Sequence, residues 1–260
     1  MYIQYKLVLK KLTGIQSEII DIIDEQAKIL TLKDPIIRSI KLQFQNNQEI
    51  SAGLFVTFNF SSEDITLEIA ESSTESLLNS IINLLIYKLN ISISDPKIHA
   101  YMVVNKSVVA SGSITLYNPE HYELPKLDYS WLADNIDSSA FSQKLKSSSH
   151  FQIYKSILLV ENVISRYLLL YSLLYELKKS QYKTDVYIKE KEPEVIMIES
   201  TKKRRKGNED SNLETTYTWW RNQSQHMQDD TSINEITKNY SKLIDGLQQI
   251  VFQAINESLK

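Results

Sequence analysis

An arginine and a histidine stand five positions apart near the C-terminal end of the chain, and their types suit proton transfer beside a negatively charged group. Arg221 is followed directly by the polar Asn222, and His226 ends the stretch. Histidine exchanges protons near neutral pH, because its unperturbed pKa is about 6.5. Arginine keeps its charge and offers a planar fork of donors to a phosphate group. The pair can therefore serve a reaction that needs both proton exchange and a fixed positive charge, such as attack of a 2′-hydroxyl on an RNA phosphodiester, in which Arg221 would stabilise negative charge on phosphorus.

The spacing restricts how the two side chains could meet. Five residues along an ideal helix turn the second side chain by about 140° from the first. One straight helix would therefore not direct Arg221 and His226 at the same phosphate. Either the helix ends between them, or two copies of the chain face each other and form a composite site.

The stretch from Arg221 to His226 resembles the ribonuclease motif of the HEPN superfamily. That motif is typically an arginine, a polar residue (often Asn, Asp or His), about three variable residues and a histidine. The similarity extends over about residues 128–260, where a long apolar segment precedes the motif and an amphipathic segment follows it. The chain differs from many members at Met227, since these have a small residue after the histidine.

The resemblance implies a C-terminal helical bundle that forms a homodimer with the motifs at its interface. It also implies a metal-independent endoribonuclease that leaves a 2′,3′-cyclic phosphate, with His226 as general base or acid, Arg221 as phosphate ligand and Asn222 orienting both. Many relatives serve as toxins or in defence against phage, so we expect an RNA such as tRNA or mRNA as substrate. A second interpretation stays open, namely a non-catalytic HEPN module that dimerises and recognises a protein or a small ligand.

Two other polar groups are candidates for supporting roles. A basic run precedes the motif and is either an arm that contacts RNA phosphates or a solvated loop; it consists of Lys202, Lys203, Arg204, Arg205 and Lys206. Three polar residues interrupt the most apolar segment of the chain; they are Glu161, Asn162 and Arg166. Because buried charges need partners, this second group either supports the motif or pairs internally.

The composition excludes several classes of protein. The chain has no cysteine, which rules out disulfides, thiolate metal sites and cysteine nucleophiles. It has 5 glycines and neither of the glycine-rich phosphate-binding motifs, and its 4 histidines are scattered, so we expect no cofactor and no metal. A net charge of -3 means that RNA would have to bind a local patch. Neither a signal peptide nor a membrane span is evident, and we therefore expect a cytoplasmic protein without a membrane partner.

The first 125 residues predict a small α+β domain. Alternation of apolar and polar residues predicts strands over 3–9, 40–44, 54–60, 65–69, 98–104 and 107–116. Apolar spacing predicts helices over 19–30 and 77–85, the second of them with Ser73 or Thr74 as its N-cap. We expect an antiparallel sheet with helices packed on it, which could sense a partner protein or ligand or select the substrate. No family resemblance extends over this half.

From about residue 126 the apolar period becomes that of helices. It predicts a short segment over 131–145, a long helix over 151–179, a third helix after Asn212 and a fourth that opens with a capping box at Ser232. Residues 183–210, which hold the basic run, predict an exposed loop. We therefore expect two domains, 1–125 and 126–260, of which the second is an antiparallel HEPN-like bundle.

Overall fold

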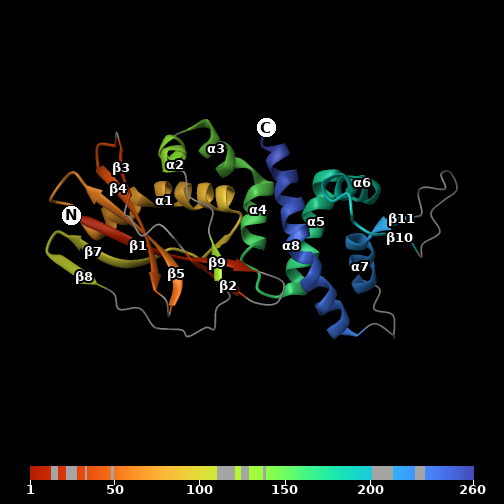
Figure 1. Cartoon of the computed structure of the whole chain (residues 1–260). Coiled ribbons are helices and arrows are strands. Elements are labelled where there is room, and N and C mark those ends of the chain that lie inside the picture. The colour runs from red at the N-terminus through yellow and green to blue at the C-terminus, as the bar shows by residue number, and fades with distance from the viewer. Residues whose placement is uncertain are drawn as a thin grey trace. The chain divides into compact units, whose positions relative to one another are not determined.

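The computed structural model divides into two compact units, of which the first contains residues 1–12 and 17–148 and the second begins at Ser149. The residues described are 1–12, 17–21, 28–32, 34–47, 50–109, 121–123, 129–136, 139–200, 213–225 and 232–260. The first unit is built on a mainly antiparallel sheet and the second is mainly helical (Figure 1). The chain is therefore of the α+β class, which confirms the prediction. No helix in the described part of the chain is long and apolar enough to cross a membrane.

The described residues of the first unit form a nine-stranded sheet. Its strands are β1 Tyr2–Leu12, β2 Ser17–Asp21, β3 Lys28–Thr31, β4 Ile37–Asn47, β5 Ile50–Phe60, β6 Ser92–Ile93, β7 Lys97–Val103, β8 Lys106–Val109 and β9 His121–Glu123. The order β3-β4-β5-β1 continues through β7 to β8, and every pair along this path is antiparallel. The far end of β1 pairs with β2 and β6, and β9 runs parallel to β2.

A 23-residue helix, α1 (Leu67–Leu89), covers the apolar face of this sheet. The hydroxyl of Thr66 accepts a hydrogen bond from the Ile69 amide and so caps its first turn, while Asn90 in a left-handed conformation ends it. The hydroxyls of Tyr5 on β1 and Thr74 on α1 form a buried hydrogen bond of 2.9 Å. This bond identifies the face of β1 on which α1 lies.

Two short helices, α2 (Tyr129–Ile136) and α3 (Ala140–Ser147), pack on α1 through aromatic rings. The ring of Tyr87 on α1 lies edge-on to Phe141 at 4.8 Å between centroids and stacks on Trp131 at 6.4 Å. Both helices therefore belong to the first unit. The helical period of their sequence, by contrast, predicts that they are part of the C-terminal bundle.

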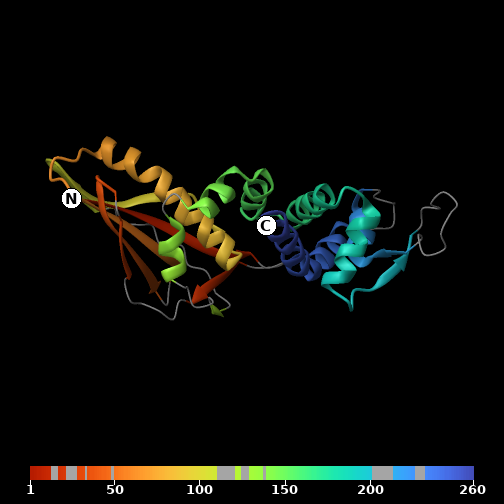
Figure 2. The same ribbon diagram turned by 90° about the horizontal axis from the view of Figure 1, so that it is seen from above.

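The second unit contains helices and a two-stranded hairpin. Its elements are α4 Ser149–Ile157, α5 Val163–Lys178, α6 Gln181–Lys191, β10 Met197–Glu199, β11 Leu213–Thr215, α7 Thr216–Gln225 and α8 Ile233–Ser258. The helices α5 and α8 lie side by side in both views of the molecule (Figures 1 and 2). Between them the rings of Tyr167 and Tyr240 stack with centroids 3.8 Å apart, and both rings are buried.

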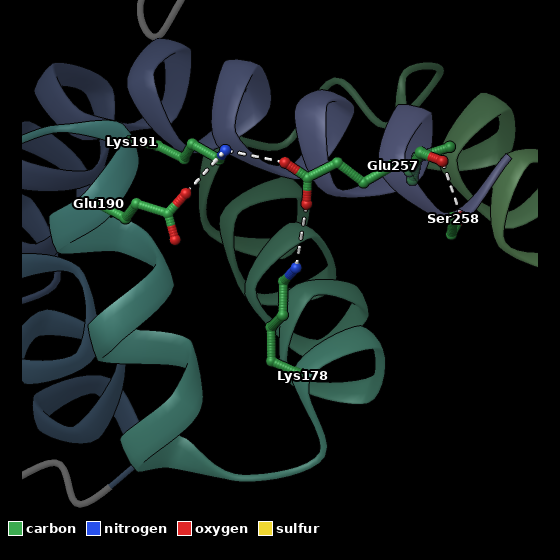
Figure 3. Close-up of polar contacts among 6 residues, drawn as sticks. Lys178, Glu190, Lys191, Glu257 and Ser258 are labelled. Atoms are coloured by element: carbon green, nitrogen blue, oxygen red, sulfur yellow. Dashed lines mark hydrogen bonds and ion pairs between the residues drawn. The ribbon is translucent and has the colours of Figure 1, made fainter. Parts of the chain in front are cut away.

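Two lysines converge on one carboxylate near the C-terminal end of α8 (Figure 3). Glu257 lies 2.8 Å from the Lys191 amine of α6 and 3.5 Å from the Lys178 amine of α5. The hydrogen bond from Lys191 is the main reason that the pKa of Glu257 is lowered. Because the three side chains are partly exposed, solvent screens their attraction, and their main effect is to fix the ends of three helices relative to one another.

Four of the predicted strands in the first half are confirmed, at 3–9, 40–44, 54–60 and 98–104. The predicted helix over 19–30 is wrong, because its described residues form β2 and β3. Short runs of isoleucine fit a strand as well as a helix, and periodicity alone does not separate the two. The predicted strand over 65–69 is also wrong, since α1 begins at Leu67 behind the Thr66 cap. Only the start of the strand over 107–116 is described, as β8.

In the second half, the fourth helix and its Ser232 cap are confirmed. The single long helix predicted over 151–179 is wrong, because the chain breaks between α4 and α5 and Asn162 caps α5 by accepting from the Ser165 amide. The predicted loop over 183–210 is wrong in its first part, where α6 and β10 lie. The prediction of an up-and-down HEPN-like bundle goes beyond what these elements establish.

Gly246 on α8 makes room for the hydroxyl of Tyr217 on α7, which donates a 2.6 Å hydrogen bond to Glu192. A Cβ at position 246 would overlap that oxygen. We predict that Gly246→Ala lowers the free energy of unfolding by about 1–3 kcal/mol through overpacking. In a Tyr217→Phe background the nearest atom is a ring carbon at 3.4 Å, and alanine should instead gain about 1 kcal/mol of helix propensity. Urea denaturation of the four variants measures this, and an equal cost in both backgrounds contradicts it.

Candidate functional site

The helix α7 carries the predicted motif and begins directly after the hairpin strand β11. The hydroxyl of Thr215, the last residue of β11, accepts from the Thr218 amide at 3.3 Å and caps the first turn of α7. The helix then continues through Arg221 and Asn222 to Gln225. Its start is therefore fixed by a strand on one side and a capping threonine on the other.

A buried carboxylate from α6 lies against this capped end. One oxygen of Asp185 accepts from the Thr215 amide at 3.0 Å, from the Thr215 hydroxyl at 2.8 Å and from the Thr218 hydroxyl at 2.6 Å. A negative charge is favourable at the N-terminus of a helix, where amides are unpaired and the helix dipole is positive. Since Thr218 gives its only hydroxyl proton to Asp185, the 2.7 Å contact between Thr218 and Tyr171 requires Tyr171 to be the donor.

A second buried carboxylate begins a chain of hydrogen bonds that ends at the arginine of the motif. Glu214 on β11 accepts from the side-chain amides of Asn222 at 3.0 Å and Gln181 at 3.1 Å. The Asn222 amide oxygen in turn accepts from the Arg221 guanidinium at 3.0 Å. Glu214 is 2% exposed and Asn222 8%, so the bond between these two side chains competes little with water. We call Glu214, Asn222 and Arg221 the hydrogen-bond chain.

The guanidinium of Arg221 is half-exposed and lies 5.5 Å from the ring of Tyr171. The bond to Asn222 is its one side-chain hydrogen bond to a described residue, and no described carboxylate lies within ion-pair distance of it. Burial raises the pKa of Tyr171 above its ordinary value of 10.0, although the Thr218 bond and the Arg221 charge act in the opposite direction. Arg221 therefore lies beside a neutral phenol, with donors left over for an anion.

Of the three predicted catalytic residues, the structure describes two. Arg221 and Asn222 are adjacent on α7 and bonded to each other. His226 and the basic run Lys202 to Lys206 lie outside the described residues.

The polar group predicted within the apolar segment divides between two local environments. Glu161 and Asn162 lie in the break before α5, where Asn162 is the cap. Arg166 is 1% exposed on α5 and donates to the Val160 carbonyl at 3.4 Å. Burial lowers the pKa of Arg166, whereas Asp245 on α8 opposes that shift. These contacts are those of groups that hold α5 in place.

Sequence reasoning missed the residues that support the motif. Asp185 lies in the segment predicted as a loop, and the sequence around Glu214 predicts only an exposed acidic residue before a helix. The one usable signal was the spacing of Thr215 and Thr218, which is that of a capping residue and its third successor. The chain also brings Tyr171 and Gln181 to the site from α5 and α6, and their positions required the tertiary fold.

Within the described residues, no group of three or more His, Asp and Glu side chains could hold a metal ion. Comparison of the chain with protein families, with curated proteins and with solved structures found no match.

The hydrogen-bond chain predicts that Glu214 contributes much more to the stability of the protein than Glu199, the other glutamate of the hairpin. Glu214→Ala removes the acceptor of the buried Asn222 amide and of the partly buried Gln181 amide, and it should lower the free energy of unfolding by about 1–3 kcal/mol. Glu214→Gln keeps one acceptor oxygen and should cost less. The control is Glu199→Ala on β10, which is exposed and should change stability by less than about 0.5 kcal/mol. Equal denaturation midpoints for the two alanine variants would contradict the assignment of Glu214 as a buried hydrogen-bond acceptor.

Proposed function

We propose that the protein is a metal-independent endoribonuclease of the HEPN type that acts as a homodimer. The main support is the state of Arg221, whose guanidinium is oriented by Asn222 and Glu214 yet keeps most of its donors unused by described residues. No described carboxylate forms an ion pair with this charge, and Arg221 stays partly exposed. An arginine that is held from one side and open on the other suits a phosphate that arrives and leaves.

In the proposed reaction one bond to phosphorus forms and another breaks, and one proton is transferred at each of the two oxygens. The 2′-oxygen forms a bond to phosphorus as His226 takes its proton, and the bond from phosphorus to the 5′-oxygen breaks as that oxygen receives a proton. The products are a 2′,3′-cyclic phosphate and a free 5′-hydroxyl. Arg221 lowers the barrier by stabilising the charge that grows on the non-bridging oxygens. Because Asn222 already holds the guanidinium, little reorganisation accompanies the step.

The course of α7 supports a composite site. The helix extends from Arg221 to Gln225 without a break, so four of the five steps toward His226 are helical. On such a helix the two side chains diverge by about 140°. We therefore place Arg221 of one copy opposite His226 of the other, and two copies would supply a second histidine for the second proton transfer.

Three further parts of the proposal follow from the same activity. The basic run Lys202 to Lys206 would contact the RNA backbone beside the motif. An RNA such as tRNA or mRNA in the cytoplasm would be the substrate, and action as a toxin or in phage defence would be the biological role. Uncontrolled cleavage of cellular RNA harms the cell, so the growth of cells that express the protein reports directly on its ribonuclease activity.

The experiment compares RNA cleavage and growth for the wild-type chain and matched pairs of variants. We predict that His226→Ala lowers the cleavage rate by about 100-fold or more and that Arg221→Ala lowers it by a similar factor. Asn222→Ala should cost less, about tenfold, since the guanidinium remains but is no longer oriented. Activity should persist in EDTA, and the products should carry cyclic phosphates.

The controls are His150→Ala on α4 and Arg38→Ala on β4, which remove the same side-chain types elsewhere. If purified wild-type protein leaves total RNA intact and all variants permit equal growth, the nuclease assignment is wrong. A dimer that binds a protein or small ligand without cutting RNA would then be the better account. Loss of cleavage in EDTA would equally contradict the metal-independent mechanism.

A further inference from the structure

The strand register of the first unit defines the composition of the sheet face opposite α1. Residues that pair across neighbouring strands lie on the same face, and the face alternates along each strand. Since Tyr5 bonds to α1, its neighbours Gln4 and Lys6 on β1 lie on the other side, which we call the open face. Its three rows across β4, β5, β1 and β7 are Gln43-Phe55-Lys6-Lys97, Lys41-Thr57-Gln4-Ala100 and Ser39-Asn59-Tyr2-Met102.

These twelve positions hold three lysines and no aspartate or glutamate. The chain as a whole has a net charge of -3, so the open face departs from the average. Three exposed acidic residues lie on α1, which covers the other face; they are Glu68, Glu71 and Glu75. The twelve positions of the open face thus carry a net positive charge, whereas α1 carries a net negative one. Such a separation directs an anionic partner to one side.

The lysines of the open face are accessible and spread over three strands. Lys97 on β7 is exposed, and Lys6 on β1 and Lys41 on β4 are half-exposed. Lys6 lies 6.0 Å from the Phe55 ring centroid, which holds its stem against the sheet. Because these strands lie side by side in the sheet, the three lysine charges are several ångströms apart. Such spacing suits an extended polyanion better than one small ion.

Polar and aromatic groups fill the space between the lysines. The amide of Gln4 donates to the Thr57 hydroxyl at 2.8 Å, and that of Asn59 donates to the Ser39 hydroxyl at 3.1 Å. His99, at the irregularity in the pairing of β7 with β1, lies edge-on to Phe55 at 4.8 Å. Burial and the Lys6 charge lower the pKa of His99, so its ring favours the neutral form. Neutral rings and side-chain amides are the groups that contact unpaired bases.

We propose that the open face binds single-stranded RNA, with Lys6, Lys41 and Lys97 contacting phosphates and His99 and Gln4 contacting bases. The choice of RNA among polyanions rests on the ribonuclease activity proposed above. In that combination the first unit selects and holds the strand that the second unit cuts. Single strands are favoured over duplexes because a sheet presents a broad surface to bases that are free to lie flat on it.

The test measures binding of a fluorescein-labelled single-stranded RNA by anisotropy, with full-length chains that also carry His226→Ala to suppress cleavage. The face variant combines Lys6→Gln, Lys41→Gln and Lys97→Gln. The control combines the same change at three exposed lysines elsewhere, Lys106, Lys146 and Lys242. Each single-strand phosphate contact contributes about 0.7 to the slope of log affinity against log salt, so the face variant should lose about 2 from that slope. At about 0.1 M salt this corresponds to a loss of affinity on the order of 100-fold, with an unchanged melting temperature.

Equal affinities of the face variant and the control variant would overturn the proposal. So would equal or tighter binding of heparin or duplex DNA by the wild-type face, since either would assign the surface to another polyanion. Cleavage by the chain with His226 intact is measured separately. If that chain does not cut RNA but the face variant alone loses RNA binding, the binding surface stands and the ribonuclease proposal fails. If that chain cuts RNA but the face variant binds RNA like the control variant, the ribonuclease proposal stands and the binding surface is wrong.

Discussion

The burial of two carboxylates against one short helix is the constraint on which the second unit depends. A carboxylate removed from water is costly unless donors surround it, and Asp185 and Glu214 obtain theirs largely from α7 and its capping residue. The strand β11 must therefore end where Thr215 reaches Asp185, and α7 must begin there. Any rotation of α7 about its axis would break bonds to both carboxylates at once. The bonds to these carboxylates thus fix the rotation of α7 about its axis, and with it the direction of Arg221.

A layer of tyrosines transmits this constraint to the rest of the bundle. Tyr171 donates to Thr218, while Tyr167 on the same helix donates to the Tyr217 carbonyl at 2.9 Å. The hydroxyl of Tyr240 on α8 donates to Ser224 at 2.6 Å, one turn from the motif arginine. Burial raises the pKa of all of these phenols, so they stay neutral and serve as donors. Rings give the layer its apolar area, and hydroxyls fix its register against α7.

The sequence allowed prediction of the elements whose pattern is decided locally. The strands β1 and β4 alternate between apolar and polar residues because one of their faces is buried under α1, and α8 has both a capping serine and a continuous apolar stripe. Prediction failed where a local sequence pattern is compatible with two different structures. The isoleucines of β2 fit either period, and Asn162 is a cap although it lies within an apolar run. Prediction of the motif rested on residue types, whereas Asp185 and Glu214 required the fold, since nothing in their own neighbourhood marks them as buried.

The chemical identity of the residue after Arg221 follows from its two neighbours. The side chain at position 222 must donate to a carboxylate on one side and accept from a guanidinium on the other, at 3.0 Å each. An asparagine amide does both through its two ends, and the Glu214 carboxylate decides which end faces Arg221. A histidine could do the same through its two nitrogens, while an aspartate would repel Glu214 unless one of them were protonated. A serine has the donor and the acceptor on one atom and is too short to separate them. Glu214 thus specifies the second residue of the motif, and a buried residue seven positions before the arginine becomes part of the site.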